Sequence, residues 1–140
     1  MSKSAIQIIN NTSQSFIENG ILGLGNIIYR FGPNLCVSNN ALSIIGAGYY
    51  SILASATILP TAEGQVTLEL YRNGVPIPGA SATVNATSTT IPITIALPPT
   101  MIKVNYNGSC PCERIPESIT IVATTGAGTA TSVSTQAIKI

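Results

Sequence analysis

The sequence contains no histidine, no aspartate and no tryptophan, so five glutamates supply all of its side-chain carboxylates. General acid–base catalysis usually relies on histidine or on a carboxyl group whose pKa is tuned toward neutrality. Nucleophilic serine or cysteine catalysis would lack its histidine base here. A glycosidase built on two glutamates would have no tryptophan to line its sugar cleft. The composition therefore predicts a protein that is not an enzyme and that carries no cofactor.

Charge of either sign is also scarce. Charged residues make up 8% of the chain, against roughly 25% in an average soluble protein. The lysines and arginines are spread singly and give a net charge of +1, which leaves no basic patch for a phosphate backbone. We therefore expect no nucleic-acid partner, and we expect serine, threonine, asparagine and glycine to fill the surface.

Residues 41–60 form a run without any charge, and its length would allow a membrane-spanning helix. Serines, threonines, two glycines and a tyrosine pair in mid-segment argue against a span, and no lysine or arginine near either end would set its orientation. We expect no membrane insertion. The apolar run near the N-terminus is too short for a secretory signal, so the chain is expected to stay in the cytoplasm where it is made, unless assembly or lysis releases it.

The cysteines, Cys36, Cys110 and Cys112, are odd in number, which argues against a disulfide framework. Cys110 and Cys112 flank a proline and could form half of a metal site, but one chain without histidine cannot supply four good ligands. We expect free thiols. An intermolecular disulfide and a metal site pooled between symmetry-related chains stay open, and the sequence does not fix the redox state of the three thiols.

Strand-like alternation is clearest at residues 65–72, where Val66, Leu68 and Leu70 fall on one face. A second long strand is expected at residues 48–59. A short turn with Pro60 and Gly64 joins the two, and we interpret them as a hairpin with one core face. The pair Asn73-Gly74 then predicts a tight turn into the next strand.

The same period of two recurs along most of the chain, with turn signals every eight to twelve residues and no helical period. This pattern is typical of an all-β sandwich or barrel, and about eight to ten strands suit a jelly roll, in which two sheets enclose one core. Pro92 predicts that strand 91–97 lies at an edge or carries a bulge. In strand 101–106 we expect Ile102, Val104 and Tyr106 to face the core.

Residues 1–24 differ from the proposed jelly-roll domain of residues 25–140, because glycine and asparagine interrupt their apolar positions. We interpret them as a short N-terminal arm that cannot form its own core. The arm is expected either to be an edge strand of the same domain or to dock on a sister subunit or a larger particle. The candidate docking residues are Ile6, Ile8, Ile9, Phe16 and Ile17.

Three segments together resemble a known family. Gly48-Tyr49-Tyr50 opens a long strand, residues 66–74 form a strand that ends in a hairpin, and residues 135–140 form a closing strand. This order resembles the complement-component and tumour-necrosis-factor-like jelly roll over roughly residues 26–140. Bacterial and phage versions occur in phage head fibres, in capsid decoration proteins and in collagen-like spore-surface glycoproteins. The chain itself has no Gly-X-Y repeat, so it contains no collagen stalk.

The resemblance implies a compact homotrimer in which aromatic and aliphatic residues of one sheet pack around a three-fold axis. A subunit face made of tyrosine, leucine, alanine and threonine costs little to desolvate, which would explain the scarcity of charge. Tyr49, Leu53 and Tyr71 are the candidate interface residues.

We therefore expect a non-enzymatic structural protein on the surface of a virion, as capsid decoration or head fibre, made in the host cytoplasm. Its arm would bind the major capsid protein or another particle shell, so removing residues 1–24 should leave the trimer intact and abolish particle binding. The alternatives are a spore-coat or exosporium protein on the spore surface, and a carbohydrate- or receptor-binding module with a pocket at subunit boundaries. The sequence leaves the particle, the copy number and any ligand open.

Overall fold

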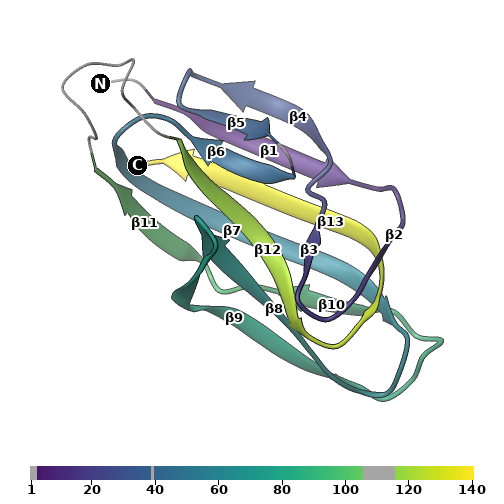
Figure 1. Cartoon of the computed structure of the whole chain (residues 1–140). Coiled ribbons are helices and arrows are strands. Elements are labelled where there is room, and N and C mark those ends of the chain that lie inside the picture. Colours follow the sequence, from purple (N-terminus) through teal and green to yellow (C-terminus); the bar gives the residue numbers. More distant parts are fainter. Residues whose placement is uncertain (1–2, 39, 106–115) are drawn as a thin grey trace.

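The computed structural model describes residues 3–38, 40–105 and 116–140 (Figure 1). All regular structure in these residues is β-strand, thirteen strands in two antiparallel sheets that pack face to face. The predicted all-β jelly-roll sandwich is confirmed. The strand count exceeds the expected eight to ten because the first 24 residues alone supply three strands.

The larger sheet, here called sheet A, has seven strands with the main order β10-β7-β13-β1-β4, and β11 and β2 pair with β7 and β13. Its strands are β1 (Ala5–Asn10), β2 (Gln14–Phe16), β4 (Asn26–Phe31), β7 (Gly48–Pro60), β10 (Ile93–Ala96), β11 (Thr100–Val104) and β13 (Gly128–Lys139).

The smaller sheet, sheet B, has six strands with the main order β5-β6-β12-β8-β9, and β3 pairs with β12. Its strands are β3 (Gly20–Leu22), β5 (Leu35–Ser38), β6 (Ala41–Ile44), β8 (Gly64–Arg72), β9 (Val75–Ala86) and β12 (Glu117–Thr125).

The core lies between the sheets because alternate residues of each strand face inward. The predicted core face of β8 is confirmed, since Val66, Leu68 and Leu70 are all buried. The largest side chain in the core belongs to Tyr50 of β7, which is fully buried. Its hydroxyl donates a hydrogen bond of 2.7 Å to the carbonyl of Gly46, and burial raises the pKa of Tyr50 above its ordinary value.

The expected hairpin between β7 and β8 is wrong. The two strands belong to different sheets, so the turn after Pro60 carries the chain across the sandwich from sheet A to sheet B. Alternation reveals which side chains are buried, and two strands that face each other across a core show the same pattern as two paired strands. The turn at Asn73-Gly74 is confirmed: both residues have positive φ, 52° and 80°, and β8 and β9 form the hairpin.

Other expectations for the strands hold with small shifts. Strand β10 lies at the edge of sheet A and begins just after Pro92, as the proline predicted, while Ile91 precedes the strand and is exposed. Ile102 and Val104 are buried in β11, as expected. Tyr106, Cys110 and Cys112 lie outside the described residues.

The uncharged run of residues 41–60 forms strands β6 and β7. Over the described ranges, the chain has no helix long and apolar enough to cross a membrane.

The N-terminal segment is not a separate arm. Strand β1 lies inside sheet A, paired with β13 on one side and with β4 on the other (Figure 1). Ile6, Ile8 and Phe16 are buried in the common core. The expected boundary at residue 24 is therefore corrected: the apolar alternation of β1 is real, but the sequence did not show that β4 covers its outer edge.

Deletion of residues 1–24 should abolish folding rather than leave a stable trimer. It would remove five buried apolar side chains, each worth about 1.5–3 kcal/mol, from a domain whose total stability is typically about 5–15 kcal/mol. These side chains are Ile6, Ile8, Phe16, Leu22 and Leu24. Thermal unfolding followed by circular dichroism checks this, with deletion of residues 1–2 as the control. A cooperative melt retained by the long deletion would contradict the integrated position of β1.

Candidate oligomer interface

The side chains that point away from the core on sheet A form an aligned set of rows, here called the outer face. The register of the strands sets the first row. Phe31 lies opposite Ala5, Ala5 opposite Ile138, Ile138 opposite Ser51 and Ser51 opposite Met101. This row crosses the sheet from β4 to β11, and Phe31 and Met101 stand at its two ends.

Two further rows run parallel to the first. One consists of Tyr29, Gln7, Gln136 and Leu53, and the other of Asn26, Ile9, Ser134, Ser55 and Ala96. Apolar groups and small polar groups thus cover the outer face. Several large apolar side chains on it are strongly exposed: Tyr29 by 74%, Phe31 and Met101 by 64% each, and Leu53 and Ile138 by 41% each.

These three rows contain no charged residue. A charged group stands at one margin, where Lys103 of β11 lies opposite Tyr49 of β7. The Lys103 ammonium is 5.7 Å from the centroid of the Tyr49 ring, a distance typical of a cation–π contact. Covering the outer face would therefore remove very little charge from water.

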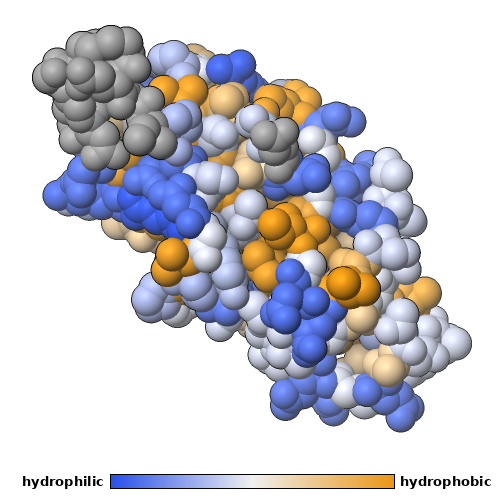
Figure 2. All heavy atoms as spheres, in the orientation of Figure 1, coloured by the Kyte–Doolittle hydropathy of each residue, from blue (hydrophilic) through white to orange (hydrophobic). Residues whose placement is uncertain are grey.

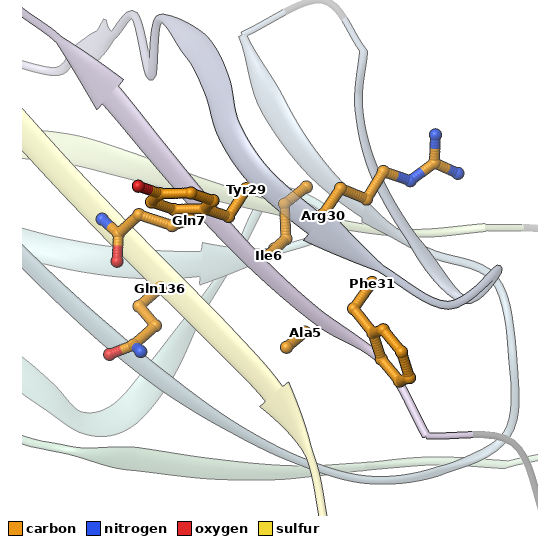
Figure 3. A pocket seen from close by; sticks show the side chains of 7 residues that line it. All are labelled: Ala5, Ile6, Gln7, Tyr29, Arg30, Phe31 and Gln136. Atoms are coloured by element: carbon orange, nitrogen blue, oxygen red, sulfur yellow. The ribbon is translucent and has the colours of Figure 1, made fainter.

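A hollow of about 450 Å³ opens on the outer face beside β4 (Figure 3). Tyr29 and Phe31 project into this region from β4, Gln7 and Gln136 face it from β1 and β13, and the Arg30 guanidinium extends away from both rings. A second hollow of about 210 Å³ adjoins the first, because Gln7 and Gln136 line both. The Gln7 amide nitrogen donates a hydrogen bond of 3.1 Å to the Ser134 hydroxyl, which fixes the side chain between the hollows.

The structure brings two of the three predicted interface residues to this face. Tyr49 and Leu53 both point outward from β7 and are exposed. Tyr71 lies on β8 in sheet B, so it stands on the opposite side of the sandwich. A hairpin of β7 and β8 would have placed Tyr71 in the same sheet as Tyr49, but the two strands lie in different sheets.

The predicted docking residues are also separated. Ile6, Ile8 and Phe16 are buried within their own domain, and their side chains are therefore not available to a partner. Ile9 is half-buried in the third row of the outer face. Ile17 is 74% exposed in the turn between β2 and β3.

The sequence did not single out the residues that build the large hollow. Tyr29 and Phe31 alternate on β4, but all six residues of that strand are exposed. The strand therefore lacks the alternation of buried and exposed residues that would have indicated its outward-facing side chains. Gln7 and Gln136 lie directly opposite each other, although they are 129 positions apart in the sequence. The alternation of residues along β13 was the signal that could have placed Ile138 on the outer face, since its neighbour Ala137 is buried and Ile138 is exposed.

The outer side of sheet B has a different character. The Thr67 and Thr83 hydroxyls lie 2.7 Å apart on neighbouring strands. Glu69, two residues after Thr67 on β8, also faces outward. Figure 2 shows an apolar patch among hydrophilic residues over β3 and β12, where the exposed Ile21 lies opposite Val122. Apolar groups on this side are more local than those on the outer face of sheet A.

An ion pair joins β8 and β12 at one end of sheet B, and its arginine also bonds to sheet A. Arg72 at the end of β8 donates to both carboxylate oxygens of Glu117, at 2.9 and 3.3 Å, and also to the Lys103 carbonyl at 2.9 Å. Asn73 donates to the same carboxylate. The hydrogen bond from Arg72 holds the pKa of Glu117 below its ordinary value, against the opposing effect of burial.

Cys36 is a free, half-buried thiol in β5. In the part of the chain that the structure describes, no three histidine, cysteine, aspartate or glutamate side chains gather closely enough to hold a metal ion. Cys110 and Cys112 lie outside the described residues, so the hypotheses about their thiols stay predictions.

Comparison with solved structures identifies the fold to which this architecture belongs. No family model matches the chain, and no curated protein matches it in sequence. Among solved structures, murine APRIL at pH 5.0 superposes with a TM-score of 0.72 at 9% identity, covering 99% of each chain. The PRD1 vertex protein P5 superposes with a TM-score of 0.64 at 15% identity, covering 98% of this chain and 96% of that one.

The globular domain of zebrafish complement 1qA gives a TM-score of 0.64 at 11% identity, covering 99% of this chain and 97% of that one. The fold is the complement C1q- and tumour-necrosis-factor-like jelly roll. The expected fold resemblance is confirmed, and it extends over nearly the whole chain rather than over residues 26–140 alone. In this jelly roll, β1 to β3 are therefore part of the common architecture.

Replacing Glu117 with glutamine should destabilise the protein by about 1–2 kcal/mol near neutral pH, because it removes the ion pair with Arg72. Solvent at the partly exposed Arg72 side chain screens this pair and limits its contribution. Since folding lowers the pKa of Glu117, its contribution is complete above the ordinary pKa of glutamate. It is lost as the pH falls through the lowered value. Urea unfolding at a series of pH values measures the difference between wild type and Glu117→Gln. The exposed Glu63→Gln serves as control, and a difference that did not change with pH would contradict the assignment.

Proposed function

We propose that this protein is a non-enzymatic jelly-roll module that forms a homotrimer through the outer face of sheet A and assembles on the surface of a phage particle. The observation that carries the trimer is the set of three uncharged rows with exposed aromatic and aliphatic side chains. Such a face resembles the buried centre of a protein interface, where charged residues are depleted and aromatic residues and methionine are enriched. Burying it leaves no unpaired ion behind.

The register suggests which residues meet at the centre of the trimer. Ile138 lies on β13, the middle strand of the main order of sheet A, and Leu53 lies on the adjacent β7, in neighbouring rows. When three copies turn this face toward a common axis, these side chains lie nearest to it. Serine and glutamine side chains around them supply hydrogen-bond donors and acceptors that can pair across subunits.

The location on a particle is supported by the likeness to a protein described as a vertex protein of PRD1, which extends over almost the full length of both chains. The proposed role is capsid decoration or a head fibre, with the major capsid protein or another shell component as partner. Ile17 is the predicted docking residue that remains strongly exposed, so the turn between β2 and β3 is the proposed contact with the shell. A spore-surface location is the competing proposal.

Light scattering on the purified protein should give about three times the chain mass of 14.4 kDa. Leu53→Glu should shift the protein to monomer, since it would place three carboxylates close together in a desolvated interface. Asn85→Glu, at an exposed position of β9 in sheet B, is the matched control and should remain trimeric. A wild type that stays monomeric at all concentrations would refute the trimer.

Mass spectrometry of purified phage particles should detect the protein at copy numbers divisible by three. Ile17→Asp should leave the trimer intact and abolish its binding to particles that lack the protein, because a charge then replaces the proposed apolar contact. Val75→Asp, at another strongly exposed position in the β8–β9 hairpin, is the control and should still bind. Detection on purified spores, with none on phage particles, would favour the spore-surface alternative.

A further inference from the structure

The large hollow and the most exposed apolar side chain of the opposite margin occupy the two ends of one row. Phe31 and Ala5, which line the hollow, begin the row at β4 and β1, and Met101 ends it at β11. We propose that Met101 of one copy enters the hollow between Tyr29 and Phe31 of the next copy. This contact rests on the proposed trimer and specifies how its subunits meet.

Ring closure supplies the geometric argument. In a cyclic trimer, a patch on one subunit contacts a different patch on the next subunit. The ring closes only if neighbouring subunits are related by a rotation without any translation. Three outer faces turned toward one axis form a triangular arrangement, in which the β11 margin of one copy meets the β4 margin of the next at each corner. Because Met101 and Phe31 belong to the same row, they lie at the same height along the strands, and they meet without any shift along the axis in a trimer whose strands run parallel to it.

The chemistry of the two patches is complementary. The hollow is lined by two exposed aromatic rings, two neutral amides, the aliphatic side chains of Ala5 and Ile6, and Arg30, whose guanidinium extends away from both rings. Methionine is flexible enough to fill an irregular hollow, and its thioether makes favourable contacts with aromatic rings. The volume of about 450 Å³ exceeds that of one methionine side chain, so neighbouring atoms of the β11 margin enter with it.

Another candidate at the same margin fits less well. Thr94 of β10 also points outward and is exposed, but it lies opposite Thr57, six residues along β7 from the row of Ser51 and Met101. At roughly 3.3 Å per residue, this offset is about 20 Å along the strand. Thr94 therefore lies far from the height of the hollow and provides a matched control position.

Disulfide trapping tests the contact directly. In a background where Cys36, Cys110 and Cys112 are replaced by serine, Met101→Cys is combined with Phe31→Cys, and oxidation should convert most of the protein into covalently linked dimers and trimers on a non-reducing gel. Thr94→Cys combined with Phe31→Cys should give none above the background of single variants. Light scattering is performed on each reduced sample before oxidation.

A second measurement covers the case in which the paired cysteines weaken assembly. A benzophenone amino acid placed at position 101 alone should crosslink on illumination to residues 5–7 or 29–31 of a neighbouring copy, as mapped by mass spectrometry. Crosslinks elsewhere in an intact trimer would overturn the proposed contact and leave the trimer standing. A stable trimer without any intersubunit crosslink would do the same, whereas a monomeric wild type would refute the proposed function itself.

Discussion

The hydrogen-bond register of sheet A is the constraint on which the proposed interface depends. Five strands from distant parts of the chain align so that one row runs from Phe31 on β4 to Met101 on β11. A slip of one residue in any of these strands would turn buried side chains outward and outer side chains inward. The buried isoleucines of β1 and β7 oppose such a slip, and the core therefore also fixes the pattern on the outer face.

The sequence was sufficient to predict which residues alternate but not which strands become neighbours. The core face of β8, the turn at Asn73-Gly74 and the edge position marked by Pro92 follow from local rules of period, positive φ and missing N–H groups. The sheet to which Tyr71 belongs and the interior position of β1 depend on pairings between residues far apart in the chain. The hollow beside Tyr29 unites β1, β4 and β13, so no local pattern could indicate it.

The scarcity of charge has a structural counterpart in where the few charges lie. Arg72 and Glu117 form their pair at one end of the sandwich, and Lys103 stands at a margin of the outer face. Serine and glutamine keep the centre of that face hydrated in a free subunit, and their desolvation costs far less than that of lysine or glutamate. Such a face is compatible both with a soluble subunit and with close packing of several copies.

The position of β13 between β7 and β1 also bears on the order of events during synthesis. Strand β1 precedes every other described strand, yet one of its two partners is β13, the last described strand, and the pair Ala5 and Ile138 is separated by almost the whole described chain. Loop closure over such a distance is slow compared with local pairing. Sheet A therefore closes only after residues 128–139 have emerged, and before that point a nascent chain has no complete outer face to offer to a second copy.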